Sequence, residues 1–302
     1  MVMKMSKMTK LLIIVLFTLL CYSCQRTYVA DIPADVVVYQ KNDGRRGTLA
    51  YFDLDNLEPV EILAPQRFSS PVWNDEINGF LGNIWILKKG PAPVQRGGIA
   101  YWLPESGKLV FCKQDSKVSE LLYQNEDKLV VIAIGDQGIF SYDMTYCQLL
   151  DIFVSGESWW RLSGLTFDES NGIIYYGVQT IDNDSNVTRK LKSFDLKTRE
   201  AIDIAEGINP SYSKSRNSIA FLGKDGLYLL DLITRNTVKL FEIPNLYLEP
   251  VNYPRWSQDG RYIAIHVPFD SLTVMGQEIV VYDTETNTLI RTGIEGIFPS
   301  FK

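Results

Sequence analysis

The sequence contains one histidine among 302 residues, and this scarcity limits the chemistry that the chain can perform. A single imidazole cannot supply a multi-histidine metal cluster or a pair of histidine bases. His266 lies in the apolar run YIAIHVP, so we predict a packed or hydrogen-bonded structural role for it. A nucleophile elbow is also missing, because GESWW around Ser158 lacks the second glycine that the sharp turn requires. We therefore expect no metal site and no cofactor, and no carboxylate pair for glycoside hydrolysis can be assigned among the 36 acidic residues.

Basic residues are too few and too scattered for a polyanion-binding protein. The chain has 30 lysines and arginines against 36 acids, and residues 1–23 contain three of the lysines and no acid. Nucleic-acid binding requires a basic face that neutralises phosphates, and no cluster of lysine and arginine supplies one. Nucleic acid is therefore excluded as a partner.

The N-terminus has the pattern of an export signal. Three lysines precede the uncharged run Leu11–Leu20. This run has the length of a secretory h-region and is too short to span a membrane. We predict a signal peptide over residues 1–23, which places the rest of the chain in an extracytoplasmic space.

The signal ends in LLCYSCQ, where Ser23 and Cys24 resemble the cleavage site of a bacterial lipoprotein. On this interpretation Cys24 becomes the lipidated N-terminus, and residues 24–33 link it to the folded body. The lipid would hold the protein at a membrane, on the periplasmic side or at the cell surface. Ordinary cleavage and an uncleaved anchor remain alternatives, because Cys21 and Tyr22 stand where aliphatic and small residues are more usual.

Helical spacing of apolar residues is missing after residue 30, and a short repeat is present instead. A phrase of proline, any residue, an aromatic and a polar or charged residue occurs four times, and its last three copies are 44 and 45 residues apart. The copies are Pro71-Val72-Trp73-Asn74, Pro210-Ser211-Tyr212-Ser213, Pro254-Arg255-Trp256-Ser257 and Pro299-Ser300-Phe301-Lys302. This period is typical of one propeller blade.

A second phrase marks the end of the third strand in each unit: an aromatic residue or leucine followed by aspartate and a turn. It occurs as Phe52-Asp53, Tyr142-Asp143, Phe194-Asp195, Leu230-Asp231 and Tyr282-Asp283. Short apolar runs lie between the two phrases, separated by Asn-Gly and Asp-Gly pairs that favour two-residue hairpin turns. Each unit is therefore predicted to be a four-stranded antiparallel meander.

Six such units account for residues 34–302. Five are complete, at 69–113, 118–153, 163–205, 208–243 and 252–291, whereas 34–63 supplies only three strands. The C-terminal IFPSFK has the pattern of the missing opening strand. We predict an all-β fold, a six-bladed β-propeller that the C-terminal strand closes by completing the N-terminal blade.

The segments PRWSQDGRYIAIHV and EIVVYDTETNTLIRTG together resemble the repeat of TolB-like β-propellers, and residues 209–241 are a looser copy. The resemblance covers units four to six well and the first three in outline. It implies an extracytoplasmic propeller that recognises a protein, a peptide or an envelope polymer. It does not identify the ligand, because propellers host unrelated activities.

Three long connectors between second and third strands are predicted at Lys88–Gly98, Gln179–Lys190 and Pro268–Gln277. Because successive strands reverse direction, these connectors share one face with the connectors between blades. Aromatic and arginine residues dominate interface hot spots. We therefore predict a binding surface on this face, formed by Arg67, Trp159, Trp160, Arg161, Tyr247, Glu249 and Tyr253.

Other conspicuous residues are predicted to be structural. The aromatic residues of the four proline phrases are expected to pack between blades. Cys112 and Cys147 are expected to be two separate thiols, because outer strands of neighbouring blades splay beyond the reach of a disulfide.

Two functional classes remain from the sequence. The first is a monomeric, membrane-tethered recognition module for a protein, peptide or envelope polymer. The second is a saccharide-binding protein or glycan-active enzyme that uses the channel mouth. The thin supply of catalytic residue types favours the first.

Overall fold

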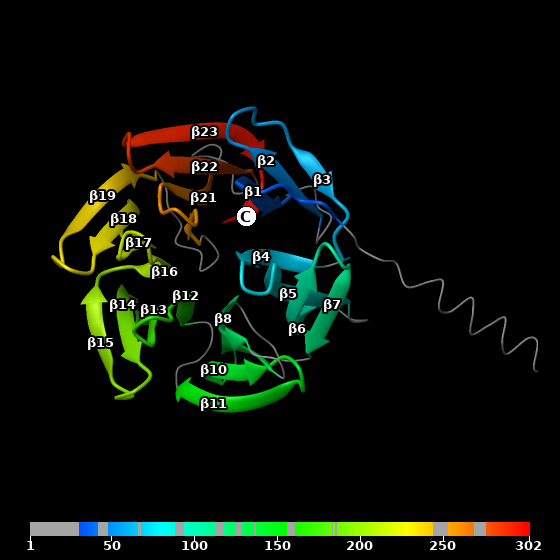
Figure 1. Cartoon of the computed structure of the whole chain (residues 1–302). Coiled ribbons are helices and arrows are strands. Elements are labelled where there is room, and N and C mark those ends of the chain that lie inside the picture. Colours follow the sequence, from blue (N-terminus) through cyan, green and yellow to red (C-terminus); the bar gives the residue numbers. More distant parts are fainter. Residues whose placement is uncertain are drawn as a thin grey trace, which may run out of the picture.

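A computed structural model of the chain describes residues 30–41, 48–65, 68–87, 94–112, 118–124, 128–135, 137–155, 161–182, 184, 186–243, 253–268 and 276–302. Its strands form six four-stranded antiparallel sheets arranged as blades around a central axis (Figure 1). This confirms the predicted six-bladed propeller. In the described ranges no helix is long and apolar enough to cross a membrane.

Within each blade the four strands succeed one another from the innermost, at the axis, to the outermost. Blade 1 consists of β24 (Ile297–Phe301), β1 (Val36–Gln40), β2 (Leu49–Asp53) and β3 (Val60–Ile62). Blade 2 consists of β4 (Phe68–Asn74), β5 (Gly79–Leu87), β6 (Val94–Leu103) and β7 (Lys108–Cys112). Blade 3 consists of β8 (Val118–Gln124), β9 (Leu129–Gly135), β10 (Gly138–Asp143) and β11 (Gln148–Val154). Blade 4 consists of β12 (Leu162–Asp168), β13 (Ile173–Ile181), β14 (Val187–Asp195) and β15 (Ala201–Ala205). Blade 5 consists of β16 (Ile208–Ser213), β17 (Ser218–Leu222), β18 (Gly226–Asp231) and β19 (Thr237–Glu242). Blade 6 consists of β20 (Arg255–Trp256), β21 (Tyr262–Pro268), β22 (Gln277–Asp283) and β23 (Thr288–Glu295).

The two ends of the propeller sequence pair within blade 1, as predicted. Strand β24 runs antiparallel to β1, with Phe301 opposite Val37 and Ser300 opposite Val38. The amide of Lys302 also donates a hydrogen bond of 3.0 Å to the carbonyl of Val36. The C-terminus therefore lies close to the axis in Figure 1, and the ring has no open sheet edge at this junction.

The innermost strands share a bulge that explains their prolines. In blades 1, 2 and 5 the residue before the proline, Phe298, Ser70 or Asn209, has a φ between 53° and 55°, and the strand register shifts at the same place. Proline cannot donate to a strand ladder and is tolerated at bulges and on edge strands. The repeated proline is therefore compatible with the strand that faces the channel.

The aspartate of the second phrase caps the turn between the third and fourth strands. In blade 5 the Asp231 carboxylate accepts hydrogen bonds of 2.8 Å from the amides of Ile233 and Thr234. Equivalent bonds to backbone amides are made by Asp53, Asp143, Asp195 and Asp283. The phrase recurs because one carboxylate satisfies the amides that this turn leaves exposed.

The cores lie between neighbouring blades. One cluster joins Leu81 and Tyr101 of blade 2 to Val131 and Phe140 of blade 3, and comparable clusters join other neighbours. Hydrogen bonds between innermost strands accompany this packing. The hydroxyl of Ser300 accepts from the amide of Trp73 at 2.9 Å, which links blades 1 and 2.

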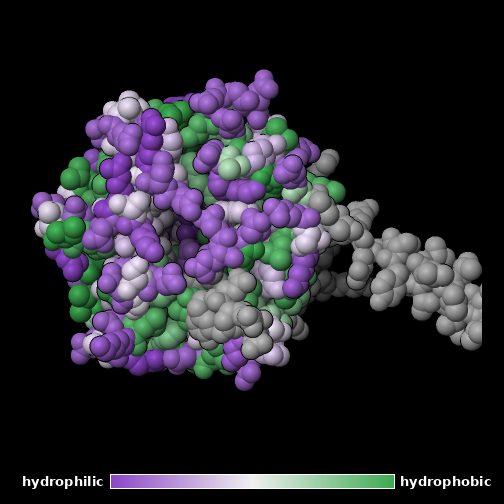
Figure 2. All heavy atoms as spheres, viewed as in Figure 1, coloured by the Kyte–Doolittle hydropathy of each residue, from purple (hydrophilic) through white to green (hydrophobic). Residues whose placement is uncertain are grey.

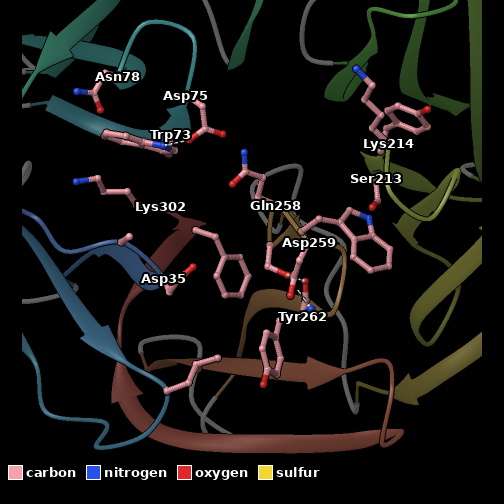
Figure 3. A pocket seen from close by; sticks show the side chains of 16 residues that line it. Asp35, Trp73, Asp75, Asn78, Ser213, Lys214, Gln258, Asp259, Tyr262 and Lys302 are labelled. Carbon is pink, nitrogen blue, oxygen red and sulfur yellow. Dashed lines mark hydrogen bonds between the residues drawn. The ribbon is translucent and has the colours of Figure 1, made fainter.

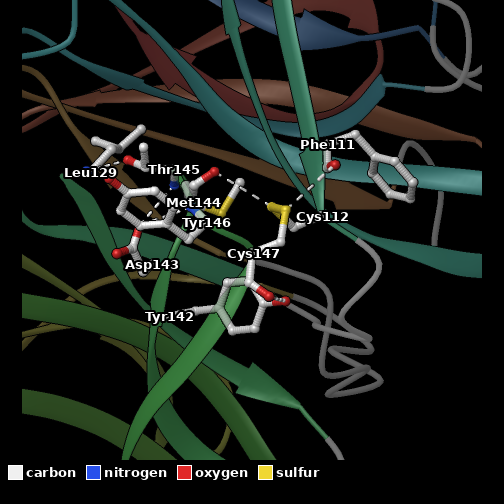
Figure 4. Close-up of a disulfide and its surroundings, with 9 residues drawn as sticks. All are labelled: Phe111, Cys112, Leu129, Tyr142, Asp143, Met144, Thr145, Tyr146 and Cys147. Atoms are coloured by element: carbon white, nitrogen blue, oxygen red, sulfur yellow. Dashed lines mark hydrogen bonds between the residues drawn. A yellow bond between two sulfur atoms is a disulfide. The ribbon is translucent and has the colours of Figure 1, made fainter. Parts of the chain in front are cut away.

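The prediction of two separate thiols is wrong, because Cys112 and Cys147 form a disulfide with a Cα–Cα distance of 5.3 Å (Figure 4). Cys147 lies beside the outermost strand of blade 3, as predicted, in the turn between β10 and β11, where its φ is 53°. Cys112 is buried among side chains of blade 3, including Met144. The turn thus reaches back to blade 2, and the splay of the outer strands does not separate the two sulfurs.

The predicted second-to-third connector Gln179–Lys190 is also wrong in length. Strands β13 and β14 pair as far as Ile181 and Val187, which leaves only residues 182–186 between them. The carboxylate of Asp182 closes this turn by accepting a bond of 2.8 Å from the amide of Asn186. In the other two predicted connectors, the segments 88–93 and 269–275 lie outside the described residues.

Candidate functional site

A cavity of about 790 Å³ opens around the axis on the face that carries the hairpins between first and second strands. We call it the axial pocket. Blades 1, 2, 5 and 6 provide its lining: Ala34, Asp35, Leu54, Trp73, Asp75, Asn78, Tyr212, Ser213, Lys214, Trp256, Ser257, Gln258, Asp259, Tyr262, Phe301 and Lys302. Figure 3 shows the labelled side chains converging around an open centre, and Figure 2 shows a hydrophilic hollow near the centre of the disc.

The aromatic residues of all four proline phrases line this pocket. Trp73, Tyr212, Trp256 and Phe301 are the last or next-to-last residues of the innermost strands of four different blades, and each is half-buried. The sequence-based expectation that they pack between blades captures only part of their position. The repeat itself is a usable signal, because equivalent positions on innermost strands must converge on the axis.

Neighbouring groups hold these rings in place. The Trp73 indole donates a hydrogen bond of 2.7 Å to Asp75, and the Trp256 indole donates one of 3.0 Å to the carbonyl of Ser211. Tyr262 stacks on Phe301 with a centroid separation of 6.4 Å. The walls are therefore preorganised, which lowers the entropy cost of binding a ligand.

The hairpin of blade 6 places a fixed carboxylate in the pocket. The Asp259 carboxylate accepts hydrogen bonds of 2.6 Å from the hydroxyl of Ser257 and 3.0 Å from the amide of Arg261. Burial alone would raise the pKa of Asp259. The two hydrogen bonds and the charge of Arg261 lower it by more than burial raises it, so the net shift is downward. The carboxyl group is therefore ionised at neutral pH.

An ion pair crosses the channel beneath the pocket. Arg255 on β20 precedes Trp256 and so lies further from the pocket rim, and its guanidinium donates to Glu120 on β8 at 2.6 Å. Blades 6 and 3 are opposite one another in a six-membered ring, so this pair spans the axis. Burial raises the pKa of Glu120, while the charge and hydrogen bond of Arg255 act against that rise. Sequence patterns give no signal for this contact, because its partners are 135 residues apart.

The sequence predicts a binding surface on the face of the long connectors, which we call the connector face, and the structure describes two of its seven residues. Arg161 is half-buried before β12, and its carbonyl accepts a hydrogen bond of 2.7 Å from Gln179. Tyr253 is buried and stacks on Phe298 at 6.5 Å. The other five are Arg67, Trp159, Trp160, Tyr247 and Glu249, which lie outside the described residues, as does Cys24. A ligand site on that face stays a prediction.

His266 has the predicted structural role. It is buried, its Nδ1 accepts a hydrogen bond of 3.3 Å from the amide of Phe298, and its ring meets the Phe298 ring edge to face. Burial lowers its pKa to about 3, so the side chain is neutral at physiological pH. Among the residues that the structure describes, no group of three or more histidine, cysteine or acidic side chains could hold a metal ion.

Comparison with solved structures finds proteins of similar fold, among them two TolB structures. TolB from Acinetobacter baumannii superimposes with a TM-score of 0.61 at 12% identity, over 89% of this chain and 67% of that chain. A putative TolB from Agrobacterium tumefaciens gives a TM-score of 0.54 at 10% identity, over 87% of this chain and 90% of that chain. A chain in a nidogen/laminin complex gives a TM-score of 0.57 at 10% identity, over 88% of this chain and 93% of that chain.

These likenesses show a shared fold and nothing finer, because identities of this size do not carry a site from one protein to another. A scan against protein-family models and a search of curated proteins give no match. The fold and the pocket together define a six-bladed propeller with a preformed cavity on its axis.

Proposed function

We propose that the chain is an extracytoplasmic recognition module, tethered to a membrane by a lipid on Cys24, that holds a protein or peptide partner in the axial pocket. The observation that carries the proposal is the pocket itself. Four blades each place an aromatic side chain around one cavity of about 790 Å³, and blades 2, 5 and 6 add a short polar hairpin. Rigid concave sites with an apolar wall and a few polar groups are typical of ligand recognition.

The disulfide supports the extracytoplasmic location. Disulfides persist in oxidising compartments and are rare in the cytosol. The bond between Cys112 and Cys147 joins blades 2 and 3, so reduction would remove a link between two neighbouring blades. This agrees with the export signal predicted over residues 1–23.

The arrangement of the aromatic rings favours a polypeptide over a saccharide. Sugar-binding sites require an open ring face on which a pyranose can stack. The face of Trp73 is covered by the ammonium of Lys302 at 4.8 Å from its centroid. Tyr262 is covered by Phe301 and by the guanidinium of Arg261, the latter 4.8 Å from the ring centroid. These contacts occupy ring faces on which a sugar would stack, and they leave charged groups beside the rings that suit the side chains and backbone amides of a polypeptide.

We expect Cys24→Ser to abolish labelling of the protein with palmitate and to release it from membranes. The thioether that carries the lipid requires the cysteine sulfur. Without that lipid, the chain has no anchor once residues 1–23 are cleaved from it. Cell fractionation with metabolic labelling measures both effects. Continued labelling of the serine variant would exclude Cys24 as the anchor.

Filling the pocket is expected to abolish partner binding. Gln258 and Ala34 are exposed residues that line the cavity, and neither has a positive φ, so Gln258→Trp and Ala34→Trp add bulk without removing packed atoms. Peptides selected from a displayed library on the intact protein should lose at least tenfold in affinity, about 1.4 kcal/mol. Lys224→Trp is the matched control, because Lys224 is exposed in the turn between β17 and β18, which lies on the opposite face.

Isothermal titration of the selected peptides measures these affinities, and a glycan array run in parallel tests the saccharide alternative. If binding survives both pocket substitutions but is lost in a variant of the connector face, the partner binds on the connector face and not in the axial pocket. Glycans that bind where no peptide does would reject the proposal of a polypeptide partner.

A further inference from the structure

Carboxylates outnumber free cations around the axial pocket. Asp35, Asp75 and Asp259 line it from blades 1, 2 and 6, and all three are exposed. Figure 3 shows them around the opening. Asp75 and Asp259 accept hydrogen bonds from Trp73 and Ser257, so their positions are fixed while further acceptor capacity remains.

In the described part of the chain neither lysine of the lining forms an ion pair with these three aspartates. The ammonium of Lys302 donates to the carbonyl of Ile32 and lies over the Trp73 ring, so it is part of the wall. Lys214 is exposed on the hairpin of blade 5. Arg261, on the same face, directs its guanidinium to Asp283 and Glu285, although its charge and that of Arg216 also lower the pKa of Asp259.

Two more acids extend the negative field across the mouth. Glu76 follows Asp75 in the hairpin of blade 2, and Glu169 lies in the hairpin of blade 4. Burial raises the pKa of Glu76, and the negative charge of Glu169 raises it further, while Lys214 lowers it. The two glutamates are thus near enough for the charge of one to act on the other, and Lys214 is near enough to Glu76 to offset part of that effect. Such an arrangement is costly without a cation to join it.

We infer that the axial pocket receives a basic segment of a polypeptide, with a lysine or arginine side chain inserted between Asp75 and Asp259; this rests on the recognition function proposed above. Both carboxylates attract an ammonium or guanidinium group that enters the pocket, and its apolar stem can contact the aromatic walls. A metal ion fits less well, because within the described part of the chain no three acidic side chains gather closely enough to hold one. The acidic rim also attracts a basic partner over a distance and raises its association rate.

A panel of synthetic peptides tests the inference. Each library-selected peptide is made in four forms, with its central residue as lysine, arginine, glutamine or glutamate, and is titrated against the full chain at 50 mM and 500 mM sodium chloride. We expect the lysine and arginine forms to bind at least tenfold more tightly than the glutamine form at low salt. We expect the glutamate form not to bind, and the preference to shrink at high salt.

Two substitutions assign the preference to the pocket. Asp75→Asn and Asp259→Asn retain an acceptor for Trp73 and Ser257 but remove a charge, so the fold is retained. Together they should reduce the lysine preference to about threefold or less. Asp225→Asn removes one exposed carboxylate from the opposite face and should leave the preference unchanged.

The outcomes separate this inference from the function on which it rests. Peptides that bind, are blocked by Gln258→Trp and show no preference for a basic residue would overturn the inference and leave the recognition function standing. A preference that persists in the Asp75→Asn, Asp259→Asn double variant would place the basic side chain elsewhere and overturn it as well. The absence of any peptide binding would overturn both.

Discussion

Deletion of residues 297–302 is expected to prevent the protein from folding to a soluble state. This segment contains the whole of β24, the innermost strand of blade 1. Its loss would remove the pairing with β1, the Ser300 acceptor for Trp73 and the ring of Phe301 in the pocket wall. The expected cost exceeds about 5 kcal/mol, which is comparable with the total stability of many domains. Differential scanning calorimetry and size-exclusion chromatography should show aggregation or no cooperative transition.

A peptide of residues 293–302 added in trans provides the control. If ring closure is the reason for the defect, this peptide should restore a cooperative transition by supplying the missing strand. A scrambled peptide of the same composition should not restore it. A soluble truncated protein with an unchanged melting temperature would refute the closure.

Breaking the Arg255–Glu120 pair is expected to have the second largest effect. The two side chains are only 11% and 17% exposed, so removing the carboxylate leaves a guanidinium in the channel with little water. Glu120→Leu should lower the free energy of unfolding by about 3 kcal/mol, the lower end of values for buried pairs because some exposure remains. Chemical denaturation monitored by circular dichroism measures it.

The double variant Glu120→Leu, Arg255→Met completes the cycle. Replacing both charges by apolar groups of similar size should recover most of the loss, because neither ion is then left unpaired. Additive losses in the double variant would show that the two side chains do not interact. Asp151→Leu, which breaks an exposed pair with Arg199, should cost less than about 1 kcal/mol and serves as the surface comparison.

Sequence periodicity is enough to predict the propeller because each blade repeats the same physical solution. Pro71, Pro210 and Pro299 mark a bulged inner strand, and Asp231 and its equivalents mark a capped turn, so both phrases are visible without a structure. Turn lengths are less predictable. The Asn171-Gly172 pair favours a two-residue turn, whereas residues 169–172 form a four-residue turn between β12 and β13.

The pocket is harder to predict because its residues are dispersed along the chain and look structural one at a time. Trp73 and Trp256 each occupy a position that packs a ring against a neighbouring blade, and only closure of the propeller brings them to one cavity.

The disulfide is not predictable from the sequence for a related reason. Whether Cys147 lies in a strand or in the preceding turn changes its distance to Cys112, and a shift of a few residues in a strand boundary is beyond what patterns resolve.

The central claim, that partners bind in the axial pocket, is tested most directly by the indole resonances of the six tryptophans. The protein is labelled with ¹⁵N at Nε1, each resonance is assigned by a Trp→Phe substitution, and a selected peptide is added. We predict that the signals of Trp73 and Trp256 shift, because both indoles line the pocket, and that buried Trp102 stays in place. Shifts confined to Trp159 and Trp160, with Trp73 and Trp256 unchanged, would place the partner on the connector face and contradict the account.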